Sequence, residues 1–176
     1  PENRVVVTDL SYVGPLGLEV DTAWNKLING VSGIVRAPPE LGFSVSAIAP
    51  LAAGFDPLNY MEKKRVDRTD PFVHYIMAAY SQFNHDASLE KLIAENPYVH
   101  GVAIGTGIGG IQTIVKQQER FAAGQNVGVF MASMTMANSG TYEVANTENR
   151  KGITKTPISA FASGNDAIIE GCEAIK

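Results

Sequence analysis

Six residues in the middle of the chain carry a pattern that can bind phosphate. The run Gly105-Thr-Gly107-Ile-Gly109-Gly110 matches G-x-G-x-x-G and lies between an apolar run and an amphipathic run. Such a turn can hold the pyrophosphate of a dinucleotide at a helix N-terminus. The acidic residue expected about 20 positions later is missing, because residues 122–129 contain no carboxylate. We therefore favour a turn in which glycines let two backbones approach closely, with a nucleotide site as the alternative.

Side chains that could bind a metal or attack a substrate are few and scattered. The single cysteine, Cys172, excludes an internal disulfide and a cysteine-based metal cluster. His74, His85 and His100 are far apart, and the first two would lie roughly 16 Å apart even on one helix. We therefore expect no metal and no cofactor, and we expect each histidine to be an ordinary surface or core residue.

The composition is that of a globular domain without an anionic partner. The 176 residues are 45% hydrophobic and 18% charged, with a formal net charge of −4, which excludes a disordered or collagen-like chain. Basic residues are scattered apart from Lys63, Lys64, Arg65 and Arg68, so nucleic acid and membrane are not expected as partners. No apolar run reaches the ~20 residues of a membrane span, and no signal-peptide pattern opens the sequence. These features favour a cytoplasmic protein.

The elements that must position these residues alternate between strands and helices. Strands are expected at 4–8, 98–104 and 156–160, with another at 43–48 inside a long excursion, and helices at 22–29, 71–83, 111–121 and 165–175. Asp21 and Asp70 are the expected N-caps of the first two helices, and Gly30 ends the first. The apolar stripe that begins at Phe72 is expected to be core. This alternation predicts an α/β fold with parallel strands.

Five segments in order carry a resemblance that covers nearly the whole chain. They are RVVVT (4–8) with GPLG (14–17), WNKLINGVSGI (24–34), FDP (55–57) with KK (63–64) and RTDPF (68–72), VAIGTGIGG (102–110) and TPISAFASG (156–164). Together they resemble the N-terminal part of the β-ketoacyl-acyl-carrier-protein synthases, elongating condensing enzymes of fatty-acid and polyketide synthesis. The resemblance implies a thiolase-like, layered α-β-α fold around a mainly parallel mixed sheet. Residues 1–176 would form one N-terminal domain, incomplete relative to the family.

The residue at the family's nucleophile position is Phe161. In these enzymes a cysteine occupies a sharp strand-to-helix turn, where the helix dipole stabilises a thiolate and backbone N–H groups hold the thioester oxyanion. Phenylalanine cannot accept an acyl group, so we expect no acyl transfer by this chain alone. Cys172 lies eleven residues later, a rise of roughly 16 Å along a helix. Ser159 and Ser163 flank the position but lack a visible base.

The resemblance also implies roles for residues around this turn. The acyl pocket would be lined by Gly107, Ile108, Ala160 and Ala162. Met131 and Met134 belong to the run VFMASMTM (129–136), where relatives carry an apolar segment that crosses a two-fold dimer interface and lines the partner's pocket. Methionines that fill a core are the alternative interpretation.

Three functions remain open at this point. The first is a ketosynthase-like subunit without its own nucleophile, comparable to the chain-length factors that pair with an active synthase. The second is a fragment or inactivated variant of an ordinary elongating synthase, which condenses an acyl thioester with malonyl-acyl-carrier protein. The third is a nucleotide-binding oxidoreductase built on residues 105–110. The first two imply acyl-carrier protein and a homo- or heterodimer with a ketoacyl synthase, and the family's two C-terminal histidines and lysine are absent from these residues.

Overall fold

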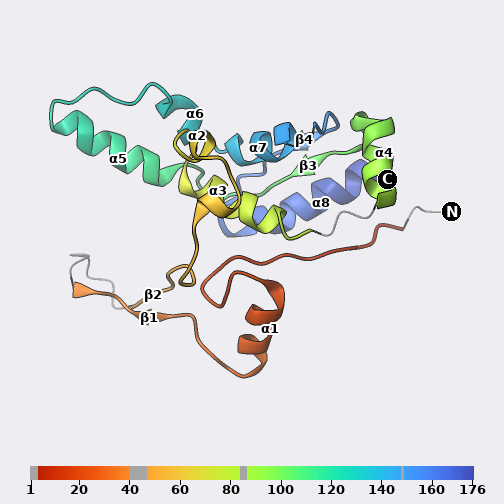
Figure 1. The fold of residues 1–176 in the computed structure, drawn as a ribbon, viewed down its shortest axis with the longest axis horizontal. Coiled ribbons are helices and arrows are strands. Elements are labelled where there is room, and N and C mark those ends of the chain that lie inside the picture. The colour runs from red at the N-terminus through yellow and green to blue at the C-terminus, as the bar shows by residue number, and fades with distance from the viewer. Residues whose placement is uncertain (1–3, 40–46, 84–86, 148) are drawn as a thin grey trace.

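The computed structural model describes residues 4–39, 47–83, 87–147 and 149–176 (Figure 1). Along these residues the elements are α1 (Val20–Ile28), β1 (Val35–Arg36), β2 (Ala47–Ile48), the 3-10 helix η2 (Pro57–Asn59), α2 (Lys63–Val66), α3 (Pro71–Tyr80), α4 (Ala87–Glu95), the 3-10 helix η3 (Pro97–Val99), β3 (Val102–Ala103), α5 (Ile111–Ala122), α6 (Met131–Thr135), α7 (Ser139–Thr147), β4 (Thr154–Lys155), the 3-10 helix η4 (Ala160–Ala162) and α8 (Ser163–Ile175). Helices therefore dominate, and the strands are short.

The N-terminal arm corrects two expectations. The predicted buried strand at 4–8 is wrong, because no described strand pairs with these residues and Val7 is 77% exposed. An extended apolar run becomes a strand only where a neighbour supplies hydrogen bonds. The N-cap of α1 is Glu19 rather than Asp21, which lies in the first turn instead. Gly30 follows the helix with a φ of 67°, the left-handed conformation that glycine adopts readily.

The long excursion after α1 contains a small antiparallel pair. Val35 pairs with Ile48, and Arg36 pairs with Ala47. The strand predicted at 43–48 is thus confirmed for its last two residues, while 43–46 lie outside the described residues.

The core forms where α3 packs against α7. Val73, Met77 and Val144 are buried there together with Met61. The apolar stripe of α3 is core, as predicted, although the helix ends at Tyr80 instead of Phe83.

Asp70 begins α3 and also holds the start of α5. Its Oδ1 accepts the Phe72 N–H at 3.1 Å, which confirms the predicted N-cap. Its Oδ2 accepts the N–H of Thr113, in the first turn of α5, at 2.7 Å. Because one carboxylate caps two helices, the helix after the glycine-rich turn is tied to the core helix.

Two parallel strands lie next to the turn that carries Phe161. Val102 of β3 pairs with Thr154 of β4, and Ala103 pairs with Lys155, so the predicted parallel pairing is confirmed. Helices α7 and α8 both contact β3, and they lie on either side of it in Figure 1. This arrangement is a small part of an α-β-α layering.

Both strands differ from their predicted bounds. The strand expected at 98–104 is reduced to β3, with η3 at its start. The strand expected at 156–160 is wrong in position, since β4 ends at Lys155. Pro157 has no N–H to donate to a sheet, although its carbonyl accepts the Thr106 N–H at 3.2 Å.

The last two predicted helices are confirmed. They are α5, which packs against α6, and α8, which begins two residues earlier than expected.

None of the helices in the described part of the chain combines the length and apolar content needed to cross a bilayer.

Candidate functional site

Phe161 is the middle residue of η4, in a sharp turn between β4 and α8 that is called here the elbow (residues 159–163). The predicted order of strand, turn and helix is present, with the turn formed by η4. Ala160 has a φ of 52°, a left-handed conformation that costs a non-glycine residue about 1–2 kcal/mol. The Phe161 ring is fully exposed, at 107% of its reference area. The side chain at this position therefore projects away from the rest of the described chain.

The hydroxyl of Ser163 holds the elbow in this shape. It is 3% exposed and accepts the Ser159 N–H at 2.9 Å. Two carbonyl oxygens are in range of its proton, those of Ala160 at 2.7 Å and Thr106 at 3.0 Å. Ser163 thus links the two sides of the elbow to the glycine-rich turn, and its hydroxyl is engaged in hydrogen bonds with backbone groups.

The glycine-rich turn packs directly against the elbow. A Cβ on Gly105 would lie 2.0 Å from the Ser163 carbonyl oxygen, a distance that no side chain tolerates. A Cβ on Gly110 would lie 2.1 Å from the Met134 carbonyl oxygen. Gly107 is in ordinary contact with the elbow, with its Cβ position 3.9 Å from the Ala160 carbonyl. Close backbone approach, the favoured interpretation of this motif, therefore accounts for Gly105 and Gly110 without a nucleotide.

The predicted pocket residues come from two segments that the fold brings together. Gly107 and Ala160 are neighbours across the turn and the elbow, while Ile108 is 63% exposed. Ala162 is also exposed, next to Phe161. The acyl-pocket role of these four residues stays a prediction.

The predicted interface methionines lie on a helix that the sequence did not predict. Met131 and Met134 belong to α6 and are half-buried. The backbone of α6 approaches the glycine-rich turn, where the Gly110 N–H donates to the Thr135 carbonyl at 3.4 Å. These contacts place α6 beside the turn, and the role of its methionines in a dimer stays a prediction.

A carboxylate that sequence reasoning missed lies at the elbow. The Ser159 hydroxyl donates a hydrogen bond to Asp166 Oδ2, and Asp166 is in the first turn of α8. The two residues are seven positions apart, and only the reversal of the chain at the elbow brings them together. An acidic residue in the first turn of a predicted helix was the one signal available in the sequence.

The remaining candidate groups lie elsewhere. Cys172 is half-buried on α8, well beyond the elbow. His74 is a core residue whose Nε2 lies 3.1 Å from the Thr69 hydroxyl and 3.3 Å from the Val66 carbonyl. Burial lowers the pKa of His74, while the Val66 hydrogen bond and the charge of Asp70 oppose that shift. His85 lies outside the described residues, and among those described no three His, Cys, Asp or Glu side chains could hold a metal ion.

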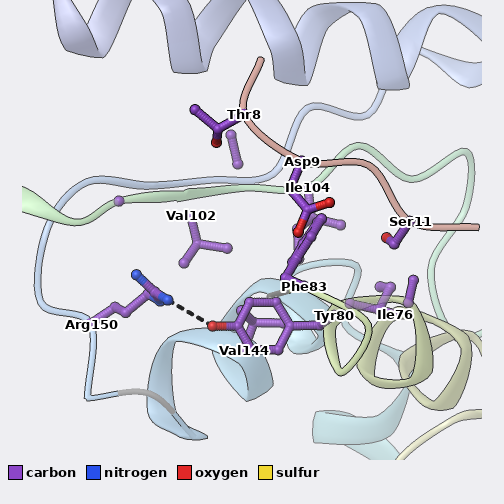
Figure 2. Close-up of a pocket in the computed structure, with 13 residues that line it drawn as sticks. Thr8, Asp9, Ser11, Ile76, Tyr80, Phe83, Val102, Ile104, Val144 and Arg150 are labelled. Carbon is purple, nitrogen blue, oxygen red and sulfur yellow. Dashed lines mark hydrogen bonds between the residues drawn. The ribbon is translucent and has the colours of Figure 1, made fainter. Parts of the chain in front are cut away.

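Figure 2 shows a separate cavity of about 520 Å³ beside β3. Its walls are mainly apolar and come from α3, β3 and α7, with Thr8 and Asp9 of the N-terminal arm at one side. Arg150 Nη2 donates to the Tyr80 hydroxyl at 2.7 Å at one end. Neither Phe161 nor any residue predicted for the acyl pocket lines this cavity.

The fold is that of the N-terminal part of a ketosynthase. The chain matches the ishigamide ketosynthase/chain length factor with a TM-score of 0.71 and 16% identity, over 94% of this chain and 49% of that one. It matches a beta-ketoacyl synthase from Burkholderia phymatum with a TM-score of 0.70 and 22% identity, over 94% and 42%. A ketosynthase in complex with its chain length factor from Xenorhabdus doucetiae gives 0.71 and 18%, over 94% and 43%.

The chain belongs to the beta-ketoacyl synthase family, because the model of that family's N-terminal domain matches residues 2–176. Among curated relatives, a 3-oxoacyl-[acyl-carrier-protein] synthase 2 from Vibrio cholerae is 41% identical over 115 residues, which are 64% of this chain and 27% of that protein. The synthase of the same name from Synechocystis is 33% identical over 95% of this chain and 41% of that protein. The one from Staphylococcus aureus is 31% identical over 98% and 42%. The chain therefore spans about two-fifths of the length of the relatives that match it end to end.

Proposed function

We propose that this chain is the N-terminal part of a ketosynthase-like subunit that carries no acyl group itself and works beside a nucleophile-bearing ketoacyl synthase. Phe161 at the elbow carries the proposal, because the family resemblance assigns the nucleophile to this position. A phenyl ring has no nucleophilic lone pair and no acidic proton, so it cannot accept an acyl group from a thioester. The other two residues of η4 are alanines, Ala160 and Ala162, so no side chain of η4 can act in its place.

The neighbouring nucleophiles do not replace it. The Ser159 hydroxyl donates to the Asp166 carboxylate, which can act as a base, but Ser159 lies two residues before the position to which the family resemblance assigns the nucleophile. The Ser163 hydroxyl is buried in backbone hydrogen bonds. Cys172 lies eleven residues along the chain from Phe161, roughly 16 Å by helical rise. Loss of acyl transfer is therefore expected to be complete in this subunit.

The proposed partners are an acyl-carrier protein and a second ketosynthase subunit, identical or different. Two of the solved neighbours are pairs of a ketosynthase with a chain length factor, which supports a role of that kind. In such a dimer Met131 and Met134 would line the pocket of the other subunit, and Gly107 and Ile108 would face the acyl chain. We place this assembly in the cytoplasm, where its acyl-carrier protein would act.

A second candidate is an inactivated or partial form of an ordinary elongating synthase. Two observations favour it: the curated relatives described above are synthases, and the elbow keeps its bend and its helix. On this reading the replacement at Phe161 alone removes the activity.

The first test asks which chain of the native assembly accepts an acyl group. The protein as purified, with whatever co-purifies, is incubated with acyl-acyl-carrier protein, and the intact mass of each chain is measured. We expect the partner to gain the acyl mass and this chain to gain none. An acyl adduct on this chain would refute the proposal.

The Phe161→Cys variant tests the second candidate in the same assay. Full acyl loading of that variant without any partner would favour an inactivated synthase. Phe121→Cys is the matched control, because Phe121 is also an exposed phenylalanine, at 74%, but lies on α5 away from the elbow. A mass gain on both variants would indicate non-specific acylation of an exposed thiol.

A further inference from the structure

The position of α6 depends on what holds its two ends. The helix is five residues long, and isolated helices shorter than ~12–15 residues are marginal in water. Its C-terminal end lies against the glycine-rich turn, where the Gly110 N–H donates to the Thr135 carbonyl at 3.4 Å. Its N-terminal end follows a loop, residues 123–130, that runs from α5 to α6 (Figure 1). The place of α6 is therefore set in part by whatever holds this loop.

Gln117 of α5 holds the loop from the buried side. It is a buried polar residue, 8% exposed. Its Oε1 accepts the Gly128 N–H at 2.7 Å, across eleven positions of the chain. The Gly128 carbonyl in turn accepts the Met131 N–H at 3.0 Å, at the start of α6. Two successive hydrogen bonds thus connect one buried side chain to the backbone of Met131.

Two further contacts hold the same loop. Arg120, about one turn after Gln117 on α5, donates to the Asn126 carbonyl from Nε at 3.2 Å and from Nη2 at 3.0 Å. The guanidinium carbon of Arg68 lies 4.5 Å from the centroid of the Phe130 ring, within range of a cation–π interaction. Both arginines are exposed, whereas Gln117 is buried. The hydrogen bond of Gln117 is therefore the one least weakened by water.

We propose that Gln117 is a positioning residue: by holding Gly128 it fixes how far Met131 and Met134 reach into the pocket of the other subunit, and so the length of the acyl chain that the pair makes. The inference rests on the proposed function, in which these methionines line that pocket, and deepens it by naming the substrate property that Gln117 controls. Methionine side chains are flexible, so a wall made of them has a defined depth only where its backbone is held. One methylene more or less in an apolar pocket changes the preference by about 10–200-fold, so a small shift of the wall changes which chain is favoured.

The test compares variants of the full-length protein, each purified together with its partner. Gln117→Met keeps the length of the side chain and removes the acceptor of the Gly128 N–H. Gln117→Glu is the conservative replacement, because it keeps an oxygen at the same reach. Gln118→Met is the matched control, since it places the same new side chain at the next, exposed position of α5.

Product length and local stability are measured on the same assemblies. Each assembly is supplied with acyl-acyl-carrier protein and malonyl-acyl-carrier protein, the products are sized by mass spectrometry, and amide hydrogen exchange is followed at Gly128 and Met131. In Gln117→Met we expect both amides to exchange about tenfold faster. The ratio of the main product to the products one extension shorter or longer should fall by about tenfold. Gln117→Glu and Gln118→Met should keep the wild-type ratio.

An unchanged product ratio in Gln117→Met, with circular dichroism and assembly unaltered, overturns the inference, and so does an unchanged exchange rate at Gly128. Arg120→Met decides the matter where Gln117→Met does not fold, because Arg120 is exposed and its replacement leaves the buried side of α5 intact. It removes another hold on the loop and should lower the product ratio by about threefold, and an unchanged ratio there then overturns the inference. The proposed function fails on different results: acyl mass on the unsubstituted chain, or no product from the wild-type pair.

Discussion

Removing the carboxylate of Asp70 tests whether one side chain ties the core helix to the glycine-rich turn. Asp70 is 1% exposed and accepts from Phe72 at 3.1 Å and from Thr113 at 2.7 Å. In Asp70→Ala the lost N-cap of α3 costs about 1 kcal/mol. The N–H of Thr113 is left buried without an acceptor, which costs about 1–3 kcal/mol more. We therefore expect the free energy of unfolding to fall by about 2–4 kcal/mol.

Urea denaturation measures this loss, and amide hydrogen exchange locates it. The Thr113 N–H should exchange faster in Asp70→Ala, by about tenfold for each 1.4 kcal/mol of local stability lost. Asp70→Asn keeps one oxygen acceptor and places an amide NH₂ opposite one of the two N–H groups. The free energy of unfolding of Asp70→Asn should lie between that of the wild type and that of Asp70→Ala.

Asp56→Ala is the matched control. Asp56 also precedes a proline and caps a short helix, accepting the Leu58 N–H at 2.9 Å, but it is exposed and holds one N–H only. Its removal should cost about 1 kcal/mol or less. Equal losses for the two alanine variants, or unchanged exchange at Thr113, would refute the reasoning that Asp70 couples two helices.

Two further predictions concern His74 and the glycines. Burial holds the pKa of His74 below the value of about 6.5 that it has in the unfolded chain. As the pH drops, the unfolded state therefore takes up the proton first. The free energy of unfolding should fall below pH 6.5, by at most about 1.4 kcal/mol per pH unit. His74→Gln should remove that part of the pH dependence of the denaturation midpoint, and an unchanged acid slope would contradict the assignment. Gly105→Ala should cost about 3 kcal/mol, because the new Cβ meets the Ser163 carbonyl. Gly171→Ala, where the Cβ meets nothing within 4 Å on α8, should instead stabilise by about 0.5–1 kcal/mol in the same thermal melts.

Local signals predicted the main helices well. The Asp-Pro pair at Asp70 located the start of α3, because a capping carboxylate and a proline at the first helical position both act within a few residues. The amphipathic run after Gly110 located α5, and the run after the elbow located α8. The N-cap of α1 was misplaced by two residues, since Glu19 and Asp21 both stand near the helix start.

Strands were predicted poorly, because their formation depends on segments that are distant along the chain. The run at 4–8 has strong β propensity, yet a strand exists only when a distant segment pairs with it. The pairing of β3 with β4 joins residues about 50 positions apart, and it moved the last strand to Thr154–Lys155, ahead of Pro157. The residues near either strand do not specify the register in which β3 pairs with β4.

The order of residues alone was enough to predict that Phe161 lies at a turn before a helix and that glycines lie where such a turn needs them. Both features depend on residues close by in the chain. Tertiary structure decided three other features: the second hydrogen bond of Asp70, the burial of the Ser163 hydroxyl, and the meeting of Ser159 with Asp166. Each joins groups that are brought together only when helices pack and the backbone reverses direction. A hydrogen bond acts over about 3 Å in space, whatever the separation along the chain.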